Sequence, residues 1–132
     1  MYSNINQIFF KELTPNINLD ILILGENMKL VYENKEINLI ECISFYNRLK
    51  GFMFKKNIKH ALLFEHCNSI HTFFMKENID VVLCNKNNTI LHYYKNLSPN
   101  HIILPKKNVT KVFELPTNYF DIKINNRLEI KK

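Results

Sequence analysis

A short stretch of mixed polar and apolar residues carries most of the groups in this chain that could do chemistry. It spans residues 67–76 and is followed closely by Asp80, so that a thiol, a hydroxyl, an imidazole, an ammonium and a carboxylate fall within 14 residues. In an extended chain, successive side chains point to opposite faces. One face would then carry Ser69, His71, Phe73 and Met75, and the other Ile70, Thr72, Phe74 and Lys76. We interpret this stretch as the floor or wall of a pocket.

Acid–base catalysis is one chemistry that these residues suggest. If the segments that carry His71 and Asp80 are adjacent, the carboxylate could orient the imidazole, as in many hydrolases and isomerases. The alternative is structural: Asp80 accepts hydrogen bonds from the backbone or from Arg48, while His71 donates one to a carbonyl group. Buried carboxylates are seldom left without such partners. The residue types therefore leave open whether the protein is an enzyme.

Cysteine and metal chemistry are less well supported. A nucleophilic Cys67 needs a nearby imidazole, but His71 lies about 13 Å away along an extended strand, so a buried structural thiol is favoured. Four residues could supply metal ligands, namely His60, His66, Cys67 and His71. The sequence has no C-x-x-C or H-x-x-H pair that would complete a tetrahedral set of ligands. We expect neither a metal nor another cofactor.

Ligand binding uses the same residues without demanding catalytic geometry. Aromatic walls with a few converging polar groups suit a small molecule or an extended peptide. The candidate ligand-binding residues are Arg48, Phe52, His71, Phe74, Met75, Lys76 and Asp80, with Phe73 as a further wall. Core packing is the alternative role for Phe52, Phe74 and Met75. We expect a small binding or accessory domain for a small molecule or a protein partner, with a hydrolase or isomerase using His71 and Asp80 as the alternative.

The composition is typical of a soluble globular domain. The chain has 132 residues, of which 46% are hydrophobic and 23% charged. No apolar run approaches the roughly 20 residues of a membrane-spanning helix, and the N-terminus lacks the pattern of a secretory signal. The three cysteines are widely spaced, which favours reduced thiols. We expect a cytoplasmic protein, either a monomer or a weak dimer.

The formal net charge of +6 comes from scattered lysines. Only Arg48 and Arg127 could make bidentate contacts with phosphates or bases, and no basic run marks a nucleic-acid-binding tail. We therefore expect no nucleic-acid binding. A basic surface that docks onto an acidic partner is a weaker alternative function.

Short β-strands separated by turn residues dominate the pattern along the chain. Ser44 and Gly51 are placed to begin and end a short helix over residues 45–50, and a second helical turn is expected after Pro116. The predicted strands are 19–24, 29–33, 37–43, 61–64, 79–84, 89–95, 109–115 and 128–130. No βαβ spacing is visible, which indicates a β-dominated α+β fold: a compact antiparallel sheet or open barrel of about seven or eight short strands with one or two short helices.

The chain divides into an N-terminal extension, residues 1–28, and one domain, residues 29–132. The extension carries apolar residues before Thr14-Pro15-Asn16 and a buried strand candidate at 19–24. We expect it to add a strand or a helix to the domain.

Three motifs together resemble a known family. They are Arg48-Leu49-Lys50-Gly51-Phe52-Met53-Phe54-Lys55, the stretch from Leu62 to Val82, and Val112-Phe113-Glu114-Leu115-Pro116 with the segment 122–128. In this order and with similar spacing they resemble the uncharacterised bacterial and archaeal family called domain of unknown function 192. The resemblance runs from about Lys29 to Ile130. It implies a compact β-rich domain with a short helix, and it implies no reaction.

Overall fold

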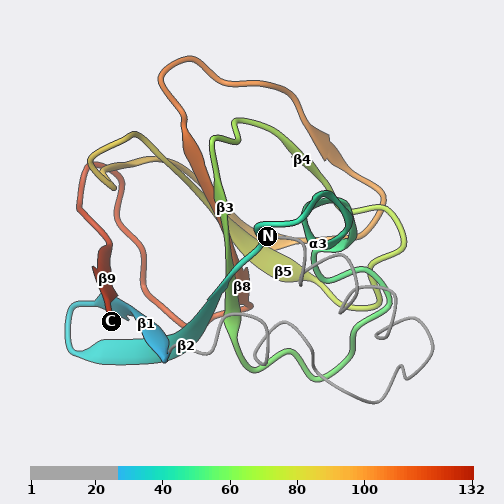
Figure 1. Ribbon diagram of the computed structural model, residues 1–132, viewed down its shortest axis with the longest axis horizontal. Coiled ribbons are helices and arrows are strands. Elements are labelled where there is room, and N and C mark those ends of the chain that lie inside the picture. The colour runs from blue at the N-terminus through green and yellow to red at the C-terminus, as the bar shows by residue number, and fades with distance from the viewer. Residues whose placement is uncertain (1–26) are drawn as a thin grey trace.

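The computed structural model describes residues 27–132. Nine strands and one short helix follow one another along this part of the chain (Figure 1). Their bounds are β1 Met28–Tyr32, β2 Lys35–Glu41, α3 Phe45–Lys50, β3 Ala61–Glu65, β4 Ile70–His71, β5 Ile79–Cys84, β6 Ile90–Leu97, β7 Ile102–Ile103, β8 Lys111–Pro116 and β9 Glu129–Lys131. The fold class predicted from the sequence, a β-dominated α+β domain, is confirmed.

Seven of the strands form one curled sheet in the order β6-β5-β8-β3-β2-β1-β9. The other two, β4 and β7, pair with each other as a small second sheet. Most neighbours are antiparallel, as expected for a chain with short connections. The result is an open half-barrel.

One pairing differs from the antiparallel pattern that the sequence predicts. β2 and β3 run parallel, with Leu39 opposite Ala61 and Glu41 opposite Leu63. Parallel neighbours need a crossover connection, usually a helix. Here the connection between Glu41 and Ala61 carries α3, a helix of six residues that is too short to give a recognisable βαβ pattern. The prediction that the chain contains no such unit was therefore wrong.

The short helix has the ends that the sequence predicts. Ser44 Oγ accepts a hydrogen bond from the Asn47 N–H at 3.1 Å, which satisfies one of the free donors of the first turn. The N–H of Gly51 donates to the Asn47 carbonyl at 2.9 Å and closes the last turn. Gly51 has φ +49°, a conformation that favours glycine. The helix therefore ends where the chain must turn sharply toward the sheet.

The main sheet carries a hydrophobic core on each of its faces. All six residues of β5 are buried, because alternate side chains enter the two cores. Val82 and Cys84 pack in the first core with Phe113, whereas Val81 and Leu83 pack in the second core. A buried polar group on one of these strands thus belongs to one core or the other, never to both.

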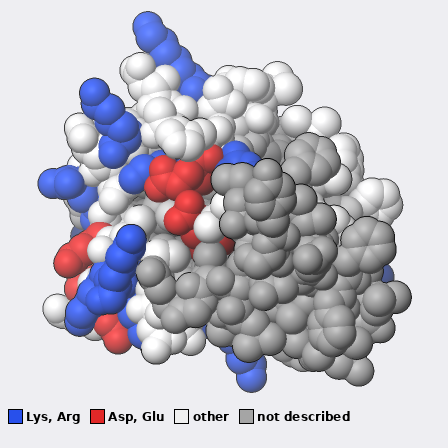
Figure 2. Space-filling view, in the orientation of Figure 1, with Lys and Arg blue, Asp and Glu red and all other residues white. Residues whose placement is uncertain are grey.

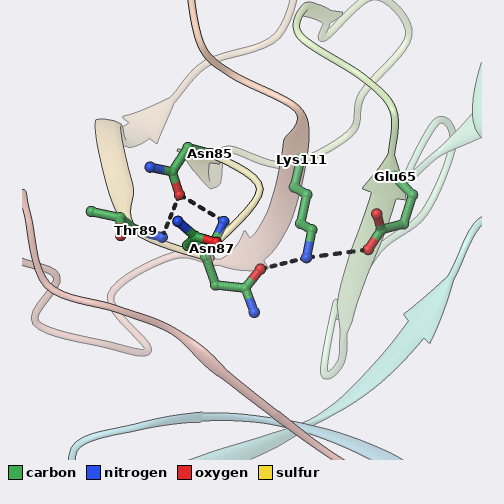
Figure 3. Close-up of polar contacts among 6 residues, drawn as sticks. Glu65, Asn85, Asn87, Thr89 and Lys111 are labelled. Carbon is green, nitrogen blue, oxygen red and sulfur yellow. Dashed lines mark hydrogen bonds and ion pairs between the residues drawn. The ribbon is translucent and has the colours of Figure 1, made fainter.

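The predicted hairpin of β5 and β6 is confirmed, and polar contacts hold its turn (Figure 3). Asn85 Oδ1 accepts hydrogen bonds from the N–H groups of Asn87 at 2.9 Å and Thr89 at 3.0 Å. Lys111 on β8 donates to Asn88 Oδ1 at 2.6 Å and pairs with Glu65 on β3 at 3.5 Å. These contacts tie the turn to two neighbouring strands.

Two local predictions were wrong. The stretch 67–76 is extended only at β4, because the chain turns at 72–75, where the N–H of Met75 donates to the Thr72 carbonyl at 3.3 Å. The expected alternation of side chains over the whole stretch is therefore lost. No helix follows Pro116, and residues 117–120 form a turn instead.

The predicted extension, residues 1–28, and the strand candidate at 19–24 lie outside the described residues, except that Met28 begins β1. Between residues 27 and 132, no helix has the length and apolar character needed to cross a membrane.

Candidate functional site

A pocket of about 110 Å³ lies where α3 and the turn after it face β4 and the second core. The end of the helix supplies one wall, the chain from Cys67 to His71 supplies another, and β8 contributes a single residue, Glu114. Thirteen residues line it: Arg48, Leu49, Lys50, Gly51, Phe52, Met53, Phe64, Cys67, Ser69, Ile70, His71, Met75 and Glu114. We call this space the Glu114 pocket.

Glu114 is a buried acid on β8, where its neighbours along the chain, Phe113 and Leu115, are apolar. Its side chain is 4% exposed and lies on the face of β8 that carries Val112. Across the ladder its neighbours are Leu62 on β3 and Val81 on β5, neither of which can pair with a carboxyl group. The backbone N–H of Phe52 donates to the carboxyl, but Oε2 has no hydrogen-bond partner in the structure. A buried acceptor without a partner is costly, so this oxygen is a candidate ligand contact.

Burial sets the protonation state of this carboxyl. It raises the pKa of Glu114 from 4.5 to about 8, and the bond from Phe52 only partly opposes that shift. At neutral pH Glu114 is therefore mainly a neutral acid. In that form Oε2 or its partner oxygen can donate a hydrogen bond as well as accept one.

Gly51 brings the backbone close to this acid. A Cβ atom at Gly51 would lie 3.2 Å from Glu114 Oε2 and 3.4 Å from the ring of Phe64. Glycine is therefore needed here both for its positive φ and for space. Phe52, which is 1% exposed, follows directly and packs in the second core, so the turn is anchored beside the carboxyl.

The other wall brings polar groups to the same pocket. His71 Nδ1 accepts a hydrogen bond from the Phe73 N–H at 3.2 Å, so a neutral ring carries its proton on Nε2. The Cys67 thiol donates to the Ser69 carbonyl at 3.1 Å. The donors of His71 Nε2 and of the Ser69 hydroxyl are the groups that this wall can offer to a ligand.

Arg48 adds a positive charge at the rim. The one polar contact of its side chain within residues 27–132 is a long hydrogen bond from Nη2 to the His66 carbonyl, 3.5 Å. A guanidinium with so little engagement keeps most of its five donors for a ligand.

Asp80 is held elsewhere, on the opposite face of the sheet. It is 1% exposed and accepts hydrogen bonds from Tyr93 Oη at 2.9 Å, the Asn96 N–H at 2.7 Å and the Asn118 N–H at 3.0 Å. The pairing of β5 with β6 shifts register between Ile79 and Val81, and Asp80 accepts the amide that this bulge frees. The structure therefore does not bring His71 and Asp80 together.

The remaining predicted residues separate into two groups. Arg48, Phe52, His71 and Met75 meet at the Glu114 pocket. Phe74 is 62% exposed and stacks on Phe54 with ring centroids 5.7 Å apart. Both aromatic residues have positive φ, and the Phe54 N–H donates to the Phe74 carbonyl at 3.0 Å. Phe74, like the exposed Lys76, lies outside the pocket because the turn at 72–75 directs it outward.

The described residues contain no metal cluster, and the face drawn in Figure 2 shows no concentrated basic patch. Within residues 27–132, no group of three or more His, Cys, Asp or Glu side chains is placed to hold a metal ion. On the face shown in Figure 2, lysine and arginine side chains project at separate points, with acidic residues between them. This face offers no single site for a polyanion.

Glu114 is the residue that reasoning from the sequence missed. A signal was present, since Glu114 alternates with Val112 and lies between the apolar residues Phe113 and Leu115. Which face of this strand meets α3 depends on the crossover between β2 and β3, and that crossover was not predicted.

The chain is similar in sequence to proteins named UPF0127 from two species. The chain is 35% identical over 101 residues to the UPF0127 protein PH1112 of Pyrococcus horikoshii, covering 72% of this chain and 84% of that protein. It is 30% identical over 84 residues to a UPF0127 protein of Thermococcus sibiricus, covering 59% of this chain and 54% of that protein. The chain thus spans most of the first relative and about half of the second.

Two crystal structures share the fold. One is of a protein from Sinorhizobium meliloti described as a candidate transcription regulator, with a TM-score of 0.66, 18% identity, and coverage of 79% of this chain and 92% of that one. The other is a protein of unknown function from Novosphingobium aromaticivorans, with a TM-score of 0.65, 11% identity, and coverage of 78% and 83%. At these identities the likeness concerns the fold alone.

The sequence pattern of the family DUF192, described as "Uncharacterized ACR", matches residues 28–130. This match covers all nine strands and α3 apart from the last residue of β9. The chain therefore belongs to the DUF192 family, whose function is unknown.

Proposed function

We propose that this protein is a small-molecule binding domain and that the Glu114 pocket is its site. The observation that carries the proposal is the buried oxygen Oε2 of Glu114, which has no partner and lies in a pocket that Arg48 and His71 also line. Folding leaves such an atom unsatisfied at a cost of roughly 1–3 kcal/mol, which a bound ligand would recover.

The size of the pocket limits what can enter it. Sites for drug-sized ligands occupy about 300–1,000 Å³, whereas the Glu114 pocket measures about 110 Å³. It would hold a very small molecule or one functional group of a larger one. Binding of a whole peptide in a groove along residues 67–80, one form of the expectation from the sequence, is less well supported because Phe74 and Lys76 point away.

Acid–base catalysis is a second candidate, with a different residue pair from the one that the sequence suggests. Asp80 is fully engaged on the far face, but His71 and the neutral acid Glu114 line one pocket. A carboxyl with a pKa near neutrality is a feature of general acids. We rank catalysis second because binding requires only the pocket. The expectations of a cytoplasmic location and of a monomer or weak dimer stay predictions.

A fragment screen followed in ¹H–¹⁵N spectra tests the binding proposal. We expect binders to shift the amide signals of Gly51, Phe52 and residues 69–71, and His71→Ala to weaken their binding. Phe74→Ala is the matched control, since Phe74 belongs to the next turn but lies outside the pocket. A screen without binders, or binders whose shifts map away from these amides, would refute the proposal.

A further inference from the structure

A second, larger hollow adjoins the Glu114 pocket. It measures about 430 Å³ and is lined by Tyr46, Leu49, Lys50, Met53, Phe54 and Lys55. Leu49, Lys50 and Met53 line both spaces. Leu49 is 55% exposed and Phe54 59% exposed, so apolar surface faces outward beside the Glu114 pocket. A ligand could thus place a polar head beside Glu114 and an apolar tail along this outer hollow.

The polar side chains that line the Glu114 pocket are mainly donors. Arg48 can only donate, and the neutral ring of His71 donates from Nε2 because Nδ1 is occupied by the Phe73 amide. Glu114 is the one acidic side chain in the lining. In its neutral form it donates too, so a ligand that enters this pocket meets donors and needs acceptors.

We propose that the Glu114 pocket binds the carboxylate of a small organic acid and that the acid's apolar tail lies along Leu49, Met53 and Phe54. This inference rests on the proposed function and adds the chemical class of the ligand. The carboxylate would accept hydrogen bonds from Arg48 and from the neutral acid Glu114. Charge-assisted bonds of this kind are stronger than neutral ones. An amine is the competing ligand class, because it would instead pair with an ionised Glu114.

Hexanoate, hexanamide and hexylamine separate these classes with one carbon skeleton. We expect hexanoate at pH 6.5 to shift the amides of Gly51, Phe52 and residues 69–71, with hexylamine giving no saturable shifts there. Preferential binding of hexylamine at the same amides would overturn the carboxylate inference while leaving the binding proposal intact. Absence of binding by all three probes would also overturn the inference, and the fragment screen decides the broader proposal separately.

Matched variants test the roles of the two key side chains. Glu114→Gln keeps the shape and a donor, so hexanoate affinity should stay within about three-fold, since no charge-assisted bond is lost. Arg48→Met should weaken hexanoate at least about ten-fold, the effect of losing one charge-assisted bond. Arg127→Met is the control, because Arg127 lies outside the pocket and donates to the Asn87 carbonyl. Hexanoate affinity at least about ten-fold higher in Glu114→Gln, with a native spectrum, would contradict a neutral Glu114, because the substitution would then have removed a repelling charge.

The pH dependence needs no variant of Glu114 and covers the case in which that variant fails to fold. Between pH 6.5 and 8.5 hexanoate should bind more weakly as Glu114 ionises and repels it, while an amine would bind more tightly. The charged or titratable groups around Glu114 are Arg48 and Lys50 from α3 and Cys67 and His71 from the opposite wall. Measuring the same pH series of hexanoate affinity in Cys67→Ser would remove any contribution from the Cys67 thiol. Hexanoate affinity that rises over this range would refute the inference.

Discussion

Gly51 lies directly over Glu114, so close that a Cβ atom on the glycine would sit 3.2 Å from the carboxyl oxygen Oε2. The end of α3 and the middle of β8 therefore meet at one close contact, where a larger residue at either position would clash with the other. This relationship links a chain turn to a buried acid and sets the inner limit of the Glu114 pocket.

Gly51→Ala should lower the free energy of unfolding by about 1–2 kcal/mol, because a side chain at positive φ is strained. The methyl group also presses on Glu114 and Phe64. Urea unfolding would measure the loss. Lys56→Ala, at an exposed position in the following loop, should change stability by less than about 0.5 kcal/mol. Equal stability of Gly51→Ala and the wild type would show that the turn is not constrained.

Glu114 should make stability fall as pH rises. Its pKa in the folded protein, about 8, lies above its ordinary value of 4.5, so between these pH values the folded state holds a proton that the unfolded state has released. The contribution of Glu114 to the free energy of unfolding is therefore greatest below its ordinary pKa and falls by up to about 1.4 kcal/mol per pH unit until the folded pKa is passed.

Glu114→Gln replaces the titratable carboxyl with a neutral amide, so it provides a reference protein without this pH dependence. Urea unfolding of both proteins between pH 5 and 8.5 should show the variant gaining stability relative to the wild type as pH rises. All other titrating groups are shared, so they cancel in the difference. A constant difference over this range would mean that Glu114 has the same pKa in both states.

Asp80→Ala should cost about 3 kcal/mol, because the Tyr93 hydroxyl and two backbone amides would lose their shared acceptor. Thermal or urea unfolding measures this loss. Asp121→Ala, at an exposed carboxylate near Tyr93, is the matched control and should have little effect. A stable Asp80→Ala protein that no longer binds ligands would restore Asp80 as a site residue.

Asn85→Ala should destabilise the β5–β6 hairpin by about 1 kcal/mol, since its side chain accepts hydrogen bonds from two amides of the turn. Faster hydrogen exchange at Asn87 and Thr89 would locate the effect. Asn87→Ala, which keeps the Asn85 contacts, is the comparison. Unchanged exchange at Thr89 would show that the backbone alone holds this turn.

The sequence was most informative where local chemistry determines local structure. Ser44 and Gly51 predict both ends of α3, and the apolar runs around residues 85–88 predict the β5–β6 hairpin. The turn at Phe74 was not predictable from its type, because a bulky aromatic residue rarely adopts positive φ. Its conformation is held by a contact from Phe54, twenty residues earlier in the chain.

Part of the candidate site followed from the sequence for the same reason. Arg48 and Phe52 lie in one short motif around Gly51, so the sequence already places them together. Asp80 was considered as a partner of His71 because the two residues are close along the chain. Strand alternation sends Asp80 to one face of the sheet and brings Glu114 to the face of His71 from 43 positions further along the chain.

The parallel pairing of β2 with β3 has a consequence for the order in which the molecule folds. Leu39 can reach its neighbour Ala61 only after the intervening chain has closed a loop, and that loop carries Arg48, Gly51 and Phe52. Closing this loop costs conformational entropy, and the stabilising contacts between the two strands can form only afterwards. We therefore expect the β5–β6 hairpin to form early and this side of the molecule late, so that a nascent chain acquires the Glu114 pocket only with its complete sheet.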